Sequence, residues 1–348
     1  MRKRIAAVGI TFAVALAAFG PAEAQQTARP WYKQPWDPAQ VRACDRACLV
    51  AIGDAYMKAL ETKNYSGLPL AEVVVMTENT GPVKIGEGLL GRENVAPTDF
   101  RVTIADPVQG QVAYQTVLKV GGRPAMVGVR LKVERNMITE IEQLYDRDVA
   151  PEAMELLTTA RPTLLADVPA DKRMSREFLT YAAESYFDAL TGEDGRIAPF
   201  AEDCIRHEKG YRTANNDGPG RATPSPVLPD PKTELGRFFI ELSQMTCEEQ
   251  VSLGVFNGIK RIWPHRALVV DEQKGLVATF PFFVHDGIRR PVPNTRMPRP
   301  GSAAGMVINL ATMETFGIRD GKIHEVEAFP FVTIPYGTGN GWSNAPTN

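Results

Sequence analysis

The chain carries one sequence pattern twice, and this repeat limits the folds it can adopt more than any other feature. Residues 54–79 align with residues 184–209 at an offset of 130, without a gap. The identical aligned pairs include Tyr56 and Tyr186, Ala59 and Ala189, Leu60 and Leu190, Pro69 and Pro199, Ala71 and Ala201, and Glu78 and Glu208. We therefore expect two tandem copies of one domain.

The offset between the copies grows along the chain, and the growth locates insertions. DPVQGQVA from Asp106 matches DEQKGLVA from Asp271 at an offset of 165, and ERNMITEIE from Glu134 matches RDGKIHEVE from Arg319 at 185. The second copy thus gains 35 residues and then 20 more. Both insertions contain proline-rich stretches, at 218–231 and 290–301, which we expect to be loops.

Both copies show the same order of secondary structure. Apolar residues recur every four positions within 48–60 and 178–190, which predicts one amphipathic helix per copy. Runs typical of β-strands follow at 71–78, 100–105, 111–120, 125–134 and 137–145 in the first copy, and at 201–208, 266–270, 276–284, 304–318 and 322–331 in the second. Helices followed by antiparallel strands predict an α+β fold.

The domain organisation follows from these elements. We expect a first domain over 31–150, a linker over 151–174, a second domain with both insertions over 175–336, and a C-terminal tail over 337–348. Because the repeat supplies each copy with a partner, we expect the two domains to pack as an intramolecular pseudo-dimer.

Residues 1–24 are typical of a secretory signal peptide. Arg2, Lys3 and Arg4 precede an apolar run over 5–19, and Ala22-Glu23-Ala24 forms a small-x-small cleavage site. The run is shorter than the roughly 20 residues that span a bilayer, so we expect cleavage before Gln25 rather than an uncleaved anchor. The mature protein is then periplasmic or secreted, and it is not bound to the membrane.

The four cysteines are expected to form disulfides, because an exported protein folds in an oxidising compartment. Of the three connectivities we favour Cys44–Cys48 with Cys204–Cys247, since a separation of four residues at the start of a helix brings Cα atoms to about 6 Å. A zinc site is the alternative. It lacks a second cysteine pair at ligand spacing.

No cofactor or metal is predicted, and nucleic acid is not an expected partner. The histidines form neither HExxH nor HxH, and the glycines form no phosphate-binding loop. With 39 Lys and Arg against 41 Asp and Glu, the chain lacks the basic surface that binds phosphate backbones.

An N-terminal helix with a tyrosine, a strand that ends in a carboxylate and the last hairpin RDGKIHEVEAF together resemble the NTF2-like superfamily, which includes ketosteroid isomerase and polyketide cyclases. CDRACL, LPLAEVVVMTEN, IRHEKGYRTANN and VVDEQKGLVATFPFF are more narrowly similar to an exported bacterial and fungal family catalogued mainly as a domain of unknown function. The resemblance implies two tandem cone-shaped α+β barrels, each a curved antiparallel sheet wrapped on N-terminal helices.

The resemblance also implies roles for particular residues. Glu208 and Glu78 align with the proton-shuttling carboxylate of ketosteroid isomerase, and Tyr186 and Tyr56 align with its oxyanion-hole tyrosine. The second oxyanion donor, an acid, aligns with Met313 and Gly128. The steroid-isomerase site is thus incomplete, and we do not predict that activity.

The second copy is richer in polar residues near its glutamate, so we place the candidate site there. We predict Glu208 as base, with Tyr186, His207 or Arg212 as acid or oxyanion donor. Strand alternation puts Arg206 and Glu208 on one face and His207 on the other. The predicted substrate-binding residues are Arg206, Tyr211, Asn215, Arg266 and His285.

The alternative for these residues is structural: an ion pair between Arg206 and Glu208, and a core tyrosine at Tyr186. Two functions follow. The first is an exported, cofactor-independent lyase, dehydratase or isomerase that acts by acid-base chemistry on a small, apolar, oxygenated molecule of aromatic or polyketide type. The second is a non-catalytic module that binds a small molecule or another protein. Self-association into a homo-oligomer is also left open.

Overall fold

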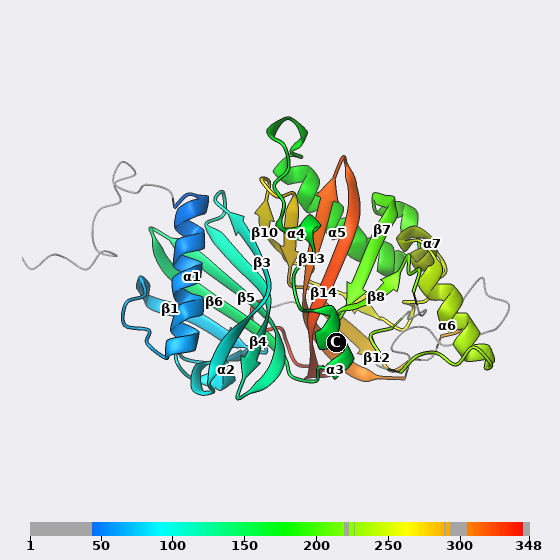
Figure 1. The fold of residues 1–348 in the computed structure, drawn as a ribbon, viewed down its shortest axis with the longest axis horizontal. Coiled ribbons are helices and arrows are strands. Elements are labelled where there is room, and N and C mark those ends of the chain that lie inside the picture. Colours follow the sequence, from blue (N-terminus) through cyan, green and yellow to red (C-terminus); the bar gives the residue numbers. More distant parts are fainter. Residues whose placement is uncertain (1–43, 219–222, 226, 289, 293–304, 344–348) are drawn as a thin grey trace, which may run out of the picture. The chain divides into compact units, whose positions relative to one another are not determined.

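The computed structural model describes residues 44–218, 223–225, 227–288, 290–292 and 305–343 (Figure 1). The predicted signal peptide and residues 31–43 of the predicted first domain lie outside this part, as does most of the second proline-rich stretch. No helix in the described ranges is both long enough and apolar enough to cross a membrane.

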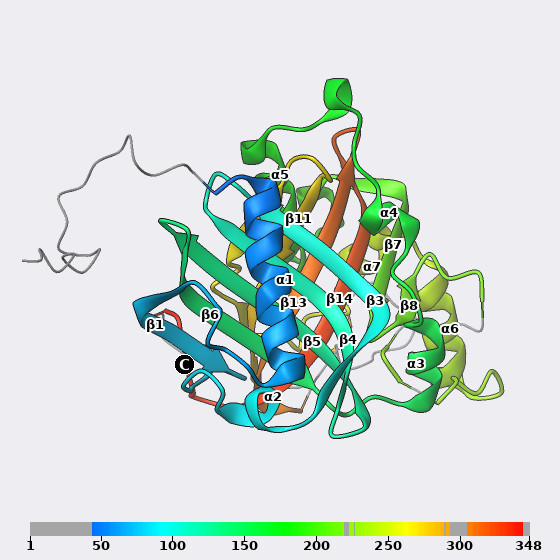
Figure 2. The same ribbon diagram turned by 60° about the vertical axis from the view of Figure 1, so that its left-hand side comes forward.

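The first copy consists of one long helix and a six-stranded sheet (Figure 2). The order of the sheet is β2-β1-β6-β5-β4-β3, and only β1 and β6 run parallel. The Asp45 carboxylate caps the first helix by accepting a hydrogen bond from the Cys48 amide, and the helix packs on the sheet through Leu49, Tyr56 and Leu60. The elements are α1 (Arg46–Thr62), β1 (Leu70–Glu78), β2 (Gly81–Pro82), α2 (Gly88–Arg92), β3 (Val95–Asp106), β4 (Gln111–Val120), β5 (Arg123–Glu134) and β6 (Met137–Asp146).

The second copy repeats this plan after a linker and adds helices. Its main sheet has the order β10-β11-β13-β14-β7-β8, β12 pairs with β13 and β9, and β7 runs parallel to β14. The linker holds α3 (Pro151–Leu156), α4 (Pro162–Leu165) and the 3-10 helix η2 (Ala170–Lys172). The copy comprises α5 (Arg176–Gly192), η3 (Gly195–Ile197), β7 (Phe200–Glu208), β8 (Tyr211–Ala214), α6 (Glu234–Gln244), α7 (Cys247–Ser252), β9 (Arg261–Ile262), β10 (Ala267–Asp271), β11 (Leu276–Thr279), β12 (Phe282–Asp286), β13 (Val307–Arg319) and β14 (Lys322–Pro335).

The α+β prediction is confirmed, with two differences in detail. The two sheets are curved and open, so neither closes into a barrel. The single strand expected over 276–284 is two strands, because Pro281 interrupts it. A proline has no N–H to donate to a neighbouring strand, and the chain therefore bends between β11 and β12.

Two aspartates at equivalent repeat positions fasten the copies together. Asp106 accepts a hydrogen bond from the Val270 amide at 3.1 Å, and Asp271 accepts one from the Ala105 amide at 3.0 Å. Each carboxylate also pairs with an arginine of the other copy, Asp106 with Arg176 at 2.6 Å and Asp271 with Arg46 at 2.7 Å. The contact is thus reciprocal, as in a twofold dimer.

A shared hydrophobic core lies between the two sheets. It contains Phe100 and Met126 of the first copy, and Met313 and Phe329 of the second. A Cβ atom on Gly128 would lie 2.9 Å from the Met313 sulfur, so the close approach of the sheets requires glycine at this position. The sheets are separate but in contact, as the pseudo-dimer prediction requires.

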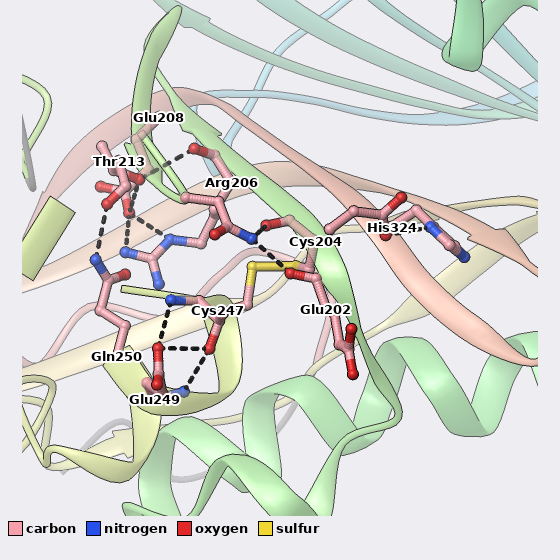
Figure 3. The surroundings of a disulfide bond; sticks show 12 residues. Glu202, Cys204, Arg206, Glu208, Thr213, Cys247, Glu249, Gln250 and His324 are labelled. Atoms are coloured by element: carbon pink, nitrogen blue, oxygen red, sulfur yellow. Dashed lines mark hydrogen bonds and ion pairs between the residues drawn. A yellow bond between two sulfur atoms is a disulfide. The ribbon is translucent and has the colours of Figure 1, made fainter. Parts of the chain in front are cut away.

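The structure pairs Cys44 with Cys48 and Cys204 with Cys247, which is the pairing that we favoured. The second disulfide ties β7 to the start of α7 (Figure 3). Two disulfides fit a protein of an oxidising compartment. We expect intact-mass measurement of the mature protein to show a gain of about 4 Da on reduction, two hydrogens per bond. Alkylation of Cys204 or Cys247 without reduction would contradict this pairing.

Candidate active site in the second copy

A cavity of about 280 Å³ lies in the second copy, with walls formed by α5, β7, β12, β13 and β14. Its lining is mostly apolar and includes Phe256, Phe283 and Phe331. Thr223 and Met306, which belong to the two insertions, also line it. Both insertions of the second copy therefore contribute residues to the wall of this cavity.

Glu208 lies at the end of β7 and lines this cavity while it is paired with Arg206. Arg206 is 1% exposed, and its Nε and Nη2 atoms contact Glu208 Oε1 at 2.9 and 2.8 Å (Figure 3). The guanidinium also stacks over the Phe256 ring at 4.7 Å. The ion pair that we considered as the structural alternative is thus present. It holds the carboxylate in place at the cavity wall rather than removing it from the cavity.

Glu314 on β13 is a second acid in the same cavity, and the sequence analysis missed it. It is 3% exposed. Burial raises its pKa to about 8, repulsion by Glu208 adds to the shift, and Arg206 opposes it. Its Oε2 atom has no hydrogen-bond partner in the described part of the chain. Glu314 is therefore mostly protonated at neutral pH and can donate a hydrogen bond into the cavity.

Strand register explains why the alignment chose Met313 instead of Glu314. Glu314 pairs with Ala328 across the β13–β14 ladder, and Val129 pairs with Gln143 at the equivalent place in the first copy. Met313 belongs to the core between the two sheets. An alignment that differs by one residue selects the opposite face of a strand. The alternation of the strand was the signal that could have identified Glu314.

Tyr186 on α5 lines the cavity and is also part of the core of the second copy. It is 4% exposed, and its ring lies 5.1 Å from Phe316 and 5.2 Å from Phe187, edge to face. Burial raises the pKa of its hydroxyl well above the usual value, although the positive charge of Arg206 opposes the shift. The hydroxyl therefore stays protonated and can serve as a donor.

His207 is not in this cavity, so its expected catalytic role there is wrong. As strand alternation predicted, it lies on the opposite face of β7 from Glu208, beside Glu325 and Glu327. Burial, with help from Arg161 and Arg212, lowers its pKa to about 2. Within the described ranges, these three side chains are the group close enough to share a metal ion. Arg161 already pairs with both glutamates.

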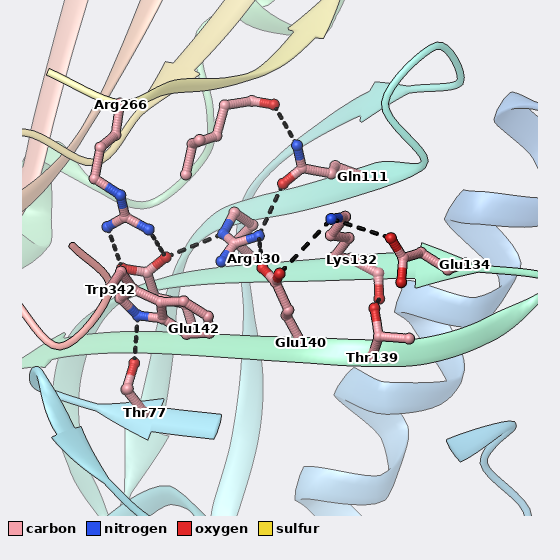
Figure 4. Close-up of polar contacts among 11 residues, drawn as sticks. Thr77, Gln111, Arg130, Lys132, Glu134, Thr139, Glu140, Glu142, Arg266 and Trp342 are labelled. Atoms are coloured by element: carbon pink, nitrogen blue, oxygen red, sulfur yellow. Dashed lines mark hydrogen bonds and ion pairs between the residues drawn. The ribbon is translucent and has the colours of Figure 1, made fainter. Parts of the chain in front are cut away.

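Four further predicted residues are also absent from the cavity lining, because other contacts hold them. Arg212 pairs with Asp217 at 3.1 Å, and Tyr211 packs in the core between the sheets. Asn215 donates hydrogen bonds to two backbone carbonyls of β7. Arg266 binds Glu142 of the first copy with two bonds of 2.7 and 2.8 Å (Figure 4). Of the predicted residues, Tyr186, Glu208 and His285 line the cavity, and Arg206 binds Glu208 at its wall.

The matching glutamate and tyrosine of the first copy are occupied by other groups of the protein. The Glu78 carboxylate accepts hydrogen bonds from the Leu89 and Leu90 amides at 2.5 and 3.0 Å, which caps the start of α2. The Tyr56 hydroxyl accepts one from Gln143 at 2.7 Å. Gln143 stands where the second copy has Ala328, so the second copy has the more open site.

The raised pKa of Glu314 predicts how stability depends on pH. Because its folded pKa of about 8 exceeds the ordinary 4.5, the folded state binds more protons than the unfolded state between these values. The contribution of Glu314 to the stability of the wild type should therefore fall as pH rises from 5 to 9. We expect the melting temperature of Glu314→Gln to drop less between pH 6 and pH 9 than that of the wild type. The exposed Glu134→Gln is the control, and equal slopes for all three proteins would contradict the shift.

Solved structures with a similar fold come from several bacteria. An NTF2-like protein of unknown function from Cytophaga hutchinsonii is 14% identical and matches over 28% of this chain and 89% of its own, with a TM-score of 0.24. A protein of unknown function with a cystatin-like fold from Methylobium petroleophilum is 11% identical and matches over 32% of this chain and 83% of its own, with a TM-score of 0.26. A protein from Kribbella flavida, provisionally assigned as a ketosteroid isomerase, is 17% identical and matches over 37% of this chain and 96% of its own, with a TM-score of 0.26.

These solved structures, one of them described as NTF2-like, are similar to parts of this chain. No curated protein matches the sequence. The family described as "Domain of unknown function (DUF8021)" matches residues 42–145 and 172–330, one segment in each copy and together more than half of the chain. The protein therefore belongs to the DUF8021 family.

Proposed function

We propose that the protein is an exported, cofactor-independent lyase, dehydratase or isomerase that acts by acid-base chemistry on a small, mostly apolar, oxygenated molecule of aromatic or polyketide type. One observation carries the proposal: a single cavity is lined by two carboxyl groups in different surroundings. Glu208 has Arg206 as its counter-ion, whereas burial raises the pKa of Glu314 to about 8. Different surroundings are what allow two carboxyl groups to act as base and acid at the same pH.

The two groups suit a proton abstraction beside a carbonyl. Glu208 takes the proton from the carbon, and the electron pair moves onto the carbonyl oxygen. Glu314 and Tyr186 donate hydrogen bonds to that oxygen as it becomes negative. The proton then returns at another carbon, which gives an isomer, or a hydroxyl group on the next carbon leaves as water after it accepts a proton, which gives a dehydrated product.

Export is part of the proposal and is supported by the two disulfides and by the typical leader of residues 1–24. A small-molecule substrate or ligand is the partner that we propose, because the cavity is small and largely apolar.

The second candidate is a binding module without catalysis. The observation that favours it is the Arg206 contact, because two nitrogens of the guanidinium already occupy one oxygen of the Glu208 carboxylate.

The two candidates are separated by a search for turnover. The mature protein is incubated with aromatic and polyketide-like compounds, and mass spectrometry looks for loss of water, loss of formaldehyde or isomerisation. Turnover that the heat-denatured protein lacks would support the enzyme. A ligand that co-purifies and stays chemically unchanged, with no turnover of any compound, would support the binding module.

A further inference from the structure

His285 contributes a second unsatisfied polar group to the cavity, far from Glu314. It lies on β12, is 2% exposed and lines the cavity. Its Nδ1 atom is buried and has no hydrogen-bond partner in the described part of the chain. Burial lowers the pKa of the imidazole to about 4, against smaller opposing effects of the Ile308 carbonyl and Asp286. A neutral imidazole keeps a nitrogen that accepts a hydrogen bond.

Strand register places His285 and Glu314 at opposite ends of the cavity. His285 pairs with Ile308, and Glu314 lies six residues farther along β13. Six residues of extended strand cover about 20 Å, and the two side chains take up part of that distance. Both residues have a buried polar atom without a partner, Nδ1 and Oε2 respectively. Such atoms are costly unless a water molecule or a ligand satisfies them.

The space between the two ends is apolar, and the described residues of the lining supply no free positive charge. Phe283, Leu310 and Phe331 line it, and no lysine or arginine occurs among its described residues. The nearby guanidinium of Arg206 is already bound to Glu208. A carboxylate or phosphate would therefore lose its hydration without gaining a counter-ion, and it would face two acidic residues.

We infer that the ligand of this cavity is an uncharged, elongated apolar molecule with an oxygen function at each end, a carbonyl bound by Glu314 and a hydroxyl bound by His285. The inference rests on the proposed function for the site and for the carbonyl at Glu314. His285 is then the residue that selects for the distal hydroxyl.

The test measures binding without turnover, by calorimetry with four related probes. The parent is 4-acetyl-4′-hydroxybiphenyl, which has a ketone and a phenol at opposite ends. The analogues are 4-acetylbiphenyl, which lacks the hydroxyl, 4′-ethylbiphenyl-4-ol, which lacks the carbonyl, and 4′-hydroxybiphenyl-4-carboxylic acid, which is charged. We expect the parent to bind about 10-fold more tightly than each analogue, the usual effect of one buried hydrogen bond.

The variant His285→Phe makes the assignment specific. It should weaken the binding of the parent compound about 10-fold and leave the binding of 4-acetylbiphenyl unchanged. The substitution His324→Phe, at a half-exposed position, should change neither affinity. Melting temperatures show whether each variant is folded, and His285→Asn, which keeps an acceptor, should restore part of the affinity if His285→Phe is unstable.

The inference would be overturned if 4-acetyl-4′-hydroxybiphenyl does not bind, or if the carboxylic acid binds most tightly of the four probes. It would also be overturned if His285→Phe weakens the binding of both ketones equally. Its failure is distinguishable from that of the proposed function. A charged substrate that depends on Glu208 would contradict only the inference, while selective binding without any turnover would contradict only the enzyme.

Discussion

Glu208→Gln is expected to lower turnover of the substrate by about 10²–10⁴-fold, the usual contribution of a positioned general base. The first copy provides an internal control. Glu78 occupies the same repeat position, but both of its oxygens accept backbone hydrogen bonds from the start of α2. A structural role that comes with the fold would be shared by both glutamates. A catalytic role would belong only to Glu208, which lines the cavity. We therefore expect Glu78→Gln to change turnover far less.

Stability must be separated from chemistry in this experiment, because Glu208→Gln leaves the buried guanidinium of Arg206 without its counter-ion. Breaking one partner of a buried pair costs about 3–5 kcal/mol. The double variant Arg206→Met/Glu208→Gln removes the charge imbalance and should be folded but inactive. Rates are compared below the melting temperature of every variant. The assignment of the site to the second copy would be contradicted if Glu208→Gln turns over the substrate at the wild-type rate. It would also be contradicted if Glu78→Gln lowers turnover more than Glu208→Gln does.

Glu142→Leu should produce the largest loss of stability, about 3–5 kcal/mol in the free energy of unfolding. Glu142 is 2% exposed and lies between two arginines (Figure 4). Arg130 contacts it from the same copy at 3.0 Å, and Arg266 contacts it from the second copy with two bonds. Removing the carboxylate leaves the guanidinium group of Arg266 without its acidic partner at the junction of the copies, while Arg130 keeps Glu140 and Gln111. Urea denaturation followed by circular dichroism measures the change.

The exposed Glu134→Leu is the matched control and should stay within about 0.5 kcal/mol of wild type. The dependence on pH gives a second check. Burial alone would raise the pKa of Glu142, but Arg266 and Arg130 outweigh it and the pKa is lowered. The stabilisation is therefore present above the ordinary pKa of a glutamate and is lost as pH falls through the lower folded value. The difference between wild type and Glu142→Leu should shrink in acid, and a constant difference would contradict this account.

The repeat, the two long helices, most strands and the disulfide pairing could be predicted from the sequence, because these features depend on local periodicity or on residue type. The four-residue spacing within 48–60 and 178–190 corresponds to α1 and α5. The strands at 111–120 and 201–208 correspond closely to β4 and β7. Strand alternation also separated His207 from Glu208 correctly. The break at Pro281 was visible in the sequence but was not used.

The membership of the site was decided only by the tertiary structure. Glu314 and Met313 are neighbours in the sequence, yet one lines the cavity and the other packs between the two sheets. Strand register determines this choice, and an error of one residue reverses it. Arg266 looked like a site residue but binds Glu142 of the other copy. Local sequence determines which elements form, whereas the packing of two curved sheets determines which polar side chains meet, because those contacts join residues more than a hundred positions apart.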